Sequence, residues 1–128
     1  MTVKTANGWQ MELDRGPDWL FVRLRGQEES KAEPQELAET VWSLLQQQFA
    51  HRLVVELDEL AQLRTGMIGE LVRLRKRIDS KGGMMRLSGV SDDNQKVLEI
   101  NHLDNFFPQY RTRTDAVMGH TTNEPDAR

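Results

Sequence analysis

The 128-residue sequence contains no cysteine. This absence excludes a disulfide framework, a thiol nucleophile, a thiolate zinc site and a redox relay. Long apolar runs are also missing, because no stretch approaches the roughly 18 apolar residues of a membrane span, and residues 1–8 lack the apolar core of a signal peptide. We therefore expect a cytoplasmic protein that does not insert into a membrane.

Familiar catalytic and metal-binding patterns are absent as well. The three histidines, His51, His102 and His120, include no pair four residues apart and no carboxylate pattern that would complete a metal site. Residues 66–69 lack the lysine of a phosphate-binding loop, and there is no serine hydrolase elbow. The acidic residues between positions 28 and 39 are interpreted as complementing a helix dipole, which leaves no acid/base pair. We expect a non-enzymatic protein without metal or cofactor.

The composition indicates one small globular domain. Apolar residues make up 38% of the chain and charged residues 29%, which is too apolar for a disordered acidic polymer. A chain of 128 residues is long enough for one core. Residues 120–128 have too few apolar side chains to pack. We expect a single domain over residues 1–118, followed by a disordered tail over residues 119–128.

Hydrophobic periodicity predicts an alternation of strands and helices. Two period-two runs across the turn Arg15-Gly16-Pro17-Asp18 predict an antiparallel hairpin, and the nearly continuous apolar run at 53–57 predicts a strand buried on both faces. The expected strands are 9–14, 19–25, 53–57, 84–87 and, at an edge, 107–110. The first expected helix has Pro34 in its first turn and apolar rows that run from Leu37 to Phe49. Further helices are expected at 67–78, after the N-cap Ser91 with Val97, Leu98 and Ile100 as its apolar residues, and at 114–118. This order predicts an α/β fold with a mixed sheet, antiparallel at its N-terminal hairpin and parallel in its core, with helices mainly on one face.

The net charge of −3 conceals an uneven distribution. Residues 1–63 contain 6 basic and 11 acidic side chains, residues 64–90 contain 7 and 2, and residues 91–128 contain 4 and 7. Arg73, Lys76 and Arg77 share one side of the second helix at i, i+3, i+4 spacing. They form either a basic docking stripe or a solvated helix face whose charge complements the helix dipole.

The junction between the 53–57 strand and the next helix carries two glycines, Gly66 and Gly69. Glycine inside a helix costs about 1 kcal/mol relative to alanine, so a close approach of another molecule would explain both. The helix N-terminus also offers backbone N–H groups to an anion or a partner surface. The alternative is purely structural, with Gly69 letting the helix pack on the sheet and Thr65 capping the helix.

Four segments in this order resemble the STAS domain, the fold of bacterial anti-sigma factor antagonists. They are Leu53-Val54-Val55-Glu56-Leu57, Gly69-Glu70-Leu71-Val72, the turn and strand from Lys81 to Gly89, and the last helix and its exit from Val97 to Pro108. The family carries an Asp-Ser-Ser-Gly loop where this chain reads Arg64-Thr65-Gly66-Met67. The serine that the family's partner kinase phosphorylates therefore falls on Gly66, and Thr65 is the one hydroxyl left in that loop.

The resemblance implies a regulatory module that docks onto an anti-sigma factor or a related serine/threonine kinase-type protein. The implied docking residues are Arg64, Gly66, Met67, Gly69, Glu70 and Arg73, with Thr65 as the candidate phosphoacceptor. Two alternatives stay open: a cytosolic STAS subunit of a membrane transport complex, and a phosphate or nucleic-acid binder that uses the basic segment 64–90. Nucleic acid is the less favoured ligand because all three tryptophans precede this segment. A homodimer also stays open.

Overall fold

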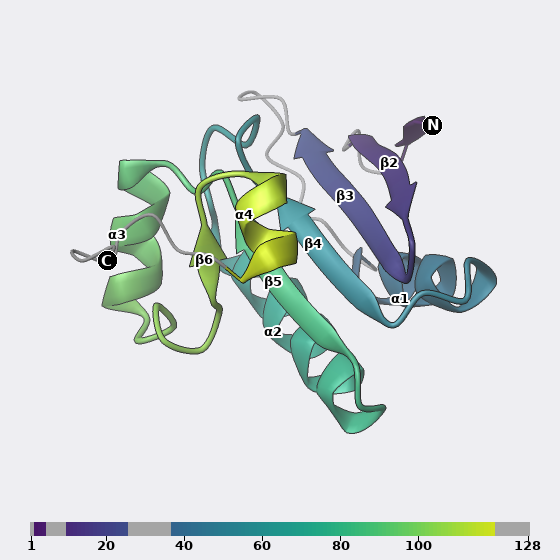
Figure 1. Cartoon of the computed structure of the whole chain (residues 1–128). Helices are drawn as coiled ribbons and strands as arrows, with labels where there is room; N and C mark the ends of the chain where they lie inside the picture. Colours follow the sequence, from purple (N-terminus) through teal and green to yellow (C-terminus); the bar gives the residue numbers. More distant parts are fainter. Residues whose placement is uncertain (1, 5–9, 26–36, 120–128) are drawn as a thin grey trace.

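The chain folds around one six-stranded sheet (Figure 1), seen in a computed structural model that describes residues 2–4, 10–25 and 37–119. The strands follow the sheet order β1-β2-β3-β4-β5-β6. They are β1 (Thr2–Lys4), β2 (Gln10–Gly16), β3 (Trp19–Arg25), β4 (Arg52–Glu56), β5 (Met84–Ser88) and β6 (Gln109–Tyr110). The helices are α1 (Leu37–Gln47), α2 (Thr65–Ser80), α3 (Asp92–Ile100) and α4 (Arg113–Met118).

Strands β2 and β3 form the predicted hairpin, with paired residues from Gln10 and Arg25 to Gly16 and Trp19. Pro17 and Asp18 make the turn. Proline suits the first position of such a turn, and the second needs the positive φ that Asp18 adopts at 62°. The Asp18 carboxylate accepts a hydrogen bond from the His51 amide at 3.2 Å and contacts the His51 ring at 3.0 Å. The turn is thereby attached to the start of β4.

The sheet is antiparallel from β1 to β3 and parallel from β3 to β6. Both faces of β4 are buried, as predicted, since Leu53, Val54 and Val55 have almost no exposed surface. The main core joins one face of the sheet to α1, α2 and α3. A smaller cluster of Trp19, Phe21, Val54 and Ala116 packs α4 on the opposite face, where α4 lies in front of the sheet (Figure 1). The mixed sheet with helices mainly on one face is confirmed.

Two apolar residues predicted to lie on buried helix faces are exposed instead. Phe49 is 82% exposed, because α1 ends at Gln47 and the chain reverses before Phe49 can face the core. Ile100 is 76% exposed, because it lies about 200° around α3 from the buried Leu98. The predicted edge strand and last helical turn are present as β6 and α4. Pro34 and residues 120–128 lie outside the described residues.

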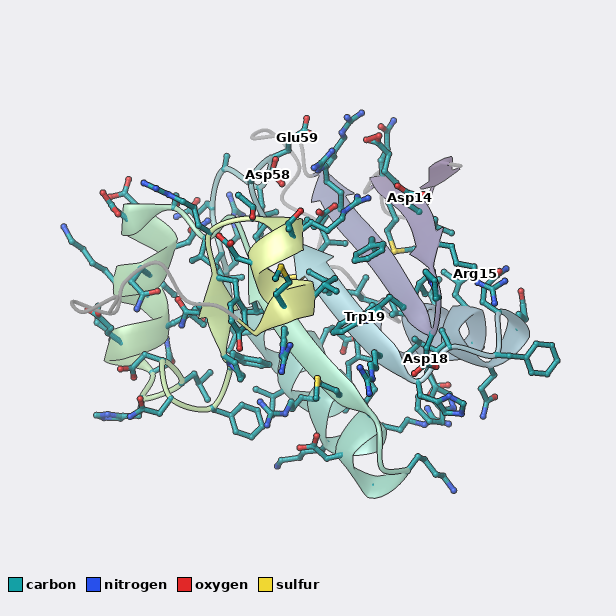
Figure 2. The ribbon with its side chains drawn as sticks, viewed as in Figure 1. Asp14, Arg15, Asp18, Trp19, Asp58 and Glu59 are labelled. Carbon is teal, nitrogen blue, oxygen red and sulfur yellow. The ribbon has the colours of Figure 1, made fainter. Side chains whose placement is uncertain are left out.

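The parallel strands give the sheet two distinct ends. Figure 2 shows Asp58 and Glu59, just beyond β4, at the end remote from Asp18 and Trp19. The loop–helix junction singled out by the sequence follows Asp58 and Glu59, and the hairpin turn marks the other end. Among the described residues, no helix combines the length and the apolar character needed to cross a bilayer.

Candidate functional site

The loop between β4 and α2 is anchored by its leucines. Leu57, Leu60 and Leu63 are each at most 4% exposed. The Leu57 amide donates to the Ser88 carbonyl at 2.9 Å, and the Leu60 amide donates to the Leu57 carbonyl at 3.1 Å. The buried leucines and their hydrogen bonds attach the loop backbone to the sheet. The residues between the leucines are exposed to solvent.

Asn94 of α3 fixes the same loop from behind. Its side chain is buried, with the residue 1% exposed. The Oδ1 atom accepts a hydrogen bond from the Leu63 amide at 2.8 Å, and Nδ2 donates to the Leu60 carbonyl at 3.2 Å. Ser91, the N-cap of α3, accepts from the Asn94 amide at 3.1 Å and holds this residue in the first turn. Loop and helix are thus joined by a polar contact inside the core.

Gly89 brings the β5–α3 connection against the same loop. It has a φ of 69°, and a Cβ at this position would lie 2.8 Å from the Asp58 Cβ and 3.1 Å from the Asp58 amide nitrogen. A larger residue would therefore clash with backbone as well as adopt a strained conformation. Gly89 and Asn94 together make the β4–α2 loop a rigid support for the helix that follows.

The first turn of α2 has no side-chain cap. Arg64 occupies the N-cap position with an extended backbone, and its side chain makes no capping hydrogen bond. The first helical bond runs from the Ile68 amide to the Arg64 carbonyl at 3.0 Å, so the amides of Thr65, Gly66 and Met67 have no acceptor within the helix. Arg64 and Thr65 are exposed. The alternative reading of Thr65 as the helix cap is wrong.

Two residues predicted to contact a partner are buried. Met67 is 1% exposed because its side chain joins the main core, so it is removed from the docking surface. Glu70 is 8% exposed, and its Oε1 accepts a hydrogen bond from the Ala38 amide in the first turn of α1 at 3.0 Å. Its carboxylate therefore complements the α1 dipole. The expected partner-contacting roles of Met67 and Glu70 are corrected to structural ones.

Gly69 and Arg73 remain on the accessible side of α2. Among the described residues, no atom outside the backbone of α2 lies within 4 Å of the position that a Gly69 Cβ would take, so none of their side chains requires glycine there. Arg73 is exposed and pairs with Glu70. Gly66 and Gly69, three residues apart on a helix, share one face. The predicted residues that the structure brings together at the surface are Arg64, Thr65, Gly66, Gly69 and Arg73, which we call the junction surface.

Three of the seven basic side chains of the segment 64–90, namely Arg73, Arg75 and Arg77, form ion pairs with acidic neighbours. Arg75 pairs with Asp79 at 3.0 Å and also donates to the Phe106 carbonyl. Arg77 pairs with Glu39 of α1, and Arg86 donates to the Ala116 carbonyl at 2.6 Å. Within the described part of the chain, Arg64, Lys76, Lys81 and Arg86 have no ion pair with an acidic side chain. In the predicted stripe of Arg73, Lys76 and Arg77, the two arginines are thus paired with acidic side chains, and Lys76 has no ion pair among the described residues.

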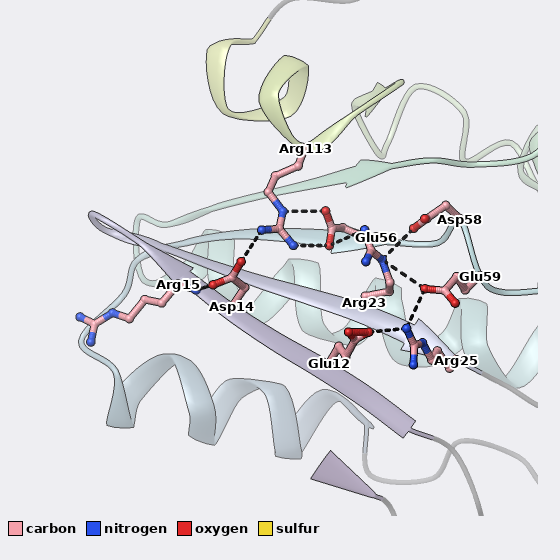
Figure 3. Close-up of polar contacts among 9 residues, drawn as sticks. All are labelled: Glu12, Asp14, Arg15, Arg23, Arg25, Glu56, Asp58, Glu59 and Arg113. Carbon is pink, nitrogen blue, oxygen red and sulfur yellow. Dashed lines mark hydrogen bonds and ion pairs between the residues drawn. The ribbon is translucent and has the colours of Figure 1, made fainter. Parts of the chain in front are cut away.

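An ionic network that sequence reasoning missed lies beside the junction, on the α4 face of the sheet. Arg113 of α4 donates to both carboxylate oxygens of Glu56 at 2.8 and 2.7 Å and to Asp14 at 2.6 Å (Figure 3). Glu56 is only 2% exposed. Arg23 approaches Glu56 at 3.5 Å and Asp58 at 3.2 Å. The network joins α4, β2, β3 and β4 to the start of the junction loop.

Titration in this network follows from its contacts. The hydrogen bond from Arg113 lowers the pKa of Asp14 below its usual value, helped by the Arg15 amide. The Glu56 and Asp14 carboxylates in turn raise the pKa of Arg113, against the effect of burial. At the other end of the sheet, the His51 contact lowers the pKa of Asp18.

Within residues 2–4, 10–25 and 37–119, histidine and acidic residues form no group of three or more suited to a metal ion. His51 lies against Asp18, and His102 occupies a left-handed turn after α3 with a φ of 58°. His120 lies outside the described residues.

The fold and its junction surface define a small α/β domain whose exposed polar site is a loop–helix junction on a rigid support. The sequence profile of the STAS domain matches residues 10–116. The chain belongs to the STAS domain family, as the sequence motifs predicted.

Solved structures of other proteins share this fold. An anti-sigma factor antagonist from Mycobacterium paratuberculosis is 15% identical, with 91% of this chain and 97% of that chain covered and a TM-score of 0.72. An anti-sigma-factor antagonist (STAS) domain protein from Planctomyces limnophilus is 22% identical, with 85% and 96% covered and a TM-score of 0.69. The phosphorylated form of SpoIIAA, a Bacillus cell fate determinant, is 16% identical, with 84% and 96% covered and a TM-score of 0.63. No curated protein sequence matches the chain significantly.

Proposed function

We propose that this chain is a non-enzymatic regulatory module that docks onto a partner protein through its junction surface. One observation carries the proposal: in the described part of the chain, nothing outside the backbone of α2 lies within 4 Å of the position that a Gly69 Cβ would take. Helix-interior glycine costs about 1 kcal/mol relative to alanine, so a contact from outside accounts for a residue that the fold does not require.

The neighbouring residues fit the same role. Arg64 is exposed beside Thr65, at a helix end whose first amides lack acceptors within the helix. Asn94 and Gly89 hold the loop in one conformation, which reduces the entropy that a partner must remove on binding. The surface is thus small, rigid and positively charged, and it favours a partner with an acidic contact region.

The partner that family membership supports best is an anti-sigma factor or a related serine/threonine kinase-type protein. Anti-sigma factor antagonists are among the solved structures with this fold. Regulation at the usual position is not available, because Gly66 has no hydroxyl group. Docking is then either constitutive or controlled through Thr65, whose hydroxyl is exposed and makes no capping bond.

A phosphate on Thr65 would lie beside Arg64, whereas the family's Asp-Ser-Ser-Gly loop has an aspartate at that place. It adds about −1.5 to −2 charges at the positive end of the α2 dipole. Arg64 is adjacent and has no ion pair among the described residues. The added charge would be neutralised locally and would order the junction, rather than simply repel a partner.

Docking is tested with the purified chain and a purified kinase-type anti-sigma factor from the same genome, by titration calorimetry. We expect Arg64→Glu and Gly69→Trp each to weaken binding by about tenfold or more. Lys81→Gln, at the opposite end of the same helix, is the matched control and should leave the affinity unchanged. Equal affinity for all four proteins would exclude the junction surface as the docking site.

Regulation is tested by incubating the chain with that kinase and ATP, followed by mass spectrometry of the peptide that contains Thr65. A mass increase of one phosphate that disappears in Thr65→Val assigns the acceptor. A chain that binds the kinase yet gains no phosphate on Thr65 docks constitutively, and the role of Thr65 as acceptor is then wrong.

A further inference from the structure

A groove of about 450 Å³ opens at the end of α2 remote from the junction surface. It lies where the C-terminal ends of α1 and α2 meet the start of β4. Its lining includes Trp42, Leu45, Phe49, Ala50, Ile78 and Lys81. The volume falls in the range of small-molecule sites, roughly 300 to 1,000 Å³.

The groove has an apolar floor and aromatic side chains at its rim. Leu45, Ala50 and Ile78 are each at most 6% exposed and belong to the main core. Trp42 is half-buried and Phe49 is exposed. An apolar body placed in this groove would therefore remove both aromatic rings from water.

Phe49 is held in a conformation that aromatic residues rarely adopt. Its φ is 53°, and it occupies the helix-ending position where glycine is usual. The Ala50 amide bonds to the Leu45 carbonyl at 3.0 Å and the Phe49 amide to the Gln46 carbonyl at 3.2 Å, which fixes this turn. A strained backbone that displays an exposed aromatic ring is typical of a functional position.

Among the described residues that line the groove, Lys81 is the cation without an ion pair. Its side chain is exposed and forms no ion pair within the described part of the chain. The other nearby bases are engaged: Arg77 pairs with Glu39 and lies over the Trp42 ring, and His51 contacts Asp18. The groove thus combines an apolar interior with a single available ammonium group.

We infer that this groove binds a small amphipathic carboxylate, a medium-chain or aryl-substituted acid. The apolar part would lie on Leu45 and Ile78 between Trp42 and Phe49, and the carboxylate would pair with Lys81. Such a ligand matches both the volume and the single positive charge. The site is separate from the junction surface, so the inference does not depend on the proposed docking function.

The test uses decanoate as the probe and decanol as its uncharged counterpart, with binding measured by calorimetry and mapped by backbone amide NMR shifts. Decanoate should bind about fivefold more tightly than decanol, the size of an exposed ion pair, with shifts at residues 45–51 and 78–83. Lys81→Gln should abolish this preference, and Phe49→Ser should weaken both probes by about fivefold.

Two variants serve as matched controls. Lys76→Gln removes another unpaired lysine of α2, and Ile100→Ser removes another exposed apolar side chain, so neither should alter binding. Equal affinity for decanoate and decanol in the unmodified protein would overturn the carboxylate assignment. Absence of binding, shifts elsewhere in the protein, or unchanged affinity in Phe49→Ser would overturn the site itself.

Discussion

At the scale of single residues, Asn94 attaches the junction loop to α3 through two hydrogen bonds. It is the buried side chain that satisfies two backbone groups of a loop that has no regular secondary structure. An apolar replacement of similar size would fill the same space but leave the Leu63 amide and the Leu60 carbonyl without partners. Unpaired buried polar groups each cost about 1 to 3 kcal/mol.

We therefore expect Asn94→Leu to lower the free energy of unfolding by about 2 to 4 kcal/mol, measured by urea denaturation. Asn101→Leu is the matched control. That residue is exposed, and its amide contacts only the Val97 carbonyl one turn back, so its loss should cost well under about 1 kcal/mol. Similar losses for both variants would show that the Asn94 bonds do not hold the loop.

Phe49, unlike Asn94, is expected to lower the stability of the fold, because it holds a left-handed backbone conformation. Phe49→Gly should raise the free energy of unfolding by about 0.5 to 1 kcal/mol. Glycine adopts the left-handed conformation without strain, and the greater flexibility that it gives the unfolded chain cancels only part of this gain. Gln47→Gly, within the last turn of α1, should instead destabilise the protein by a similar amount. Thermal denaturation of the three proteins distinguishes the outcomes, and a destabilised Phe49→Gly would contradict the strain.

At the scale of elements, α2 connects the two ends of the sheet and carries a candidate site at each of its ends. Gly69 and Gly83 illustrate two different reasons for glycine. Among the described residues, a Cβ on Gly69 would meet no atom within 4 Å outside the backbone of α2, whereas a Cβ on Gly83 would lie 2.5 Å from the His51 carbonyl oxygen. None of the described side chains requires the first glycine, and the second is required by the close approach of His51, the residue before β4.

Gly69→Ala should therefore raise the free energy of unfolding by about 1 kcal/mol, and Gly83→Ala, its matched control, should lower it. Chemical denaturation measures both. If the alanine at position 69 failed to stabilise the helix, the conclusion that the fold does not require this glycine would be wrong, and the docking proposal would lose its main support.

Periodicity also decides which elements the sequence reveals. The hairpin and the buried strand β4 were predictable because alternation and a continuous apolar run each correspond to one arrangement. The ends of the helices were not predictable, because apolar residues in the sequence can keep the 3.6-residue spacing beyond the last hydrogen-bonded turn. Phe49 was assigned to an apolar row of α1 for this reason, and it is exposed. Ile100 lies within α3 but on the side away from Leu98, and it is exposed as well.

The candidate site was predictable in position but not in detail. The residues of the junction surface follow from the motif order, yet the burial of Met67 and Glu70 depends on α1 packing beside α2. The excess of basic over acidic residues in the segment 64–90 likewise does not reveal that Arg77 forms an ion pair with Glu39 on another helix. Partners supplied by distant elements leave no local pattern.

At the scale of the whole molecule, the contact between Glu56 and Arg113 spans 57 residues of sequence. It attaches α4 to the centre of the sheet, and the Arg113 guanidinium also lies 4.3 Å from the Phe21 ring centroid. Removing one partner leaves a charge uncompensated in a nearly dry position. Removing both exchanges the pair for apolar contact, which is often close to neutral.

We expect Arg113→Met to lower the free energy of unfolding by about 3 kcal/mol or more, since Glu56 then keeps only the weaker approach of Arg23. The double variant Glu56→Met with Arg113→Met should recover most of this loss, and a double-mutant cycle from urea denaturation measures the coupling. Additive losses would mean that the two side chains act independently.

The same network makes stability depend on acidity through Asp14. Its folded pKa is lowered, chiefly by the hydrogen bond from Arg113, so the unfolded chain takes up a proton at this carboxyl at higher pH than the folded protein does. The stabilising contribution is therefore complete above the unfolded value of about 3.9 and is lost as the pH falls through the lower folded value. The pKa of Asp18 is lowered by His51, so this carboxyl contributes to the pH dependence of stability in the same direction.

The Asp14→Asn variant should show a shallower dependence of stability on pH below about 4 than the unmodified protein, measured as the urea midpoint at successive pH values. Because Asp14 is exposed, 1 M salt, which reduces the electrostatic screening length to about 3 Å, should bring the pH curves of the two proteins together. Identical curves at low salt would show that the Arg113 contact does not favour the ionised carboxylate of Asp14.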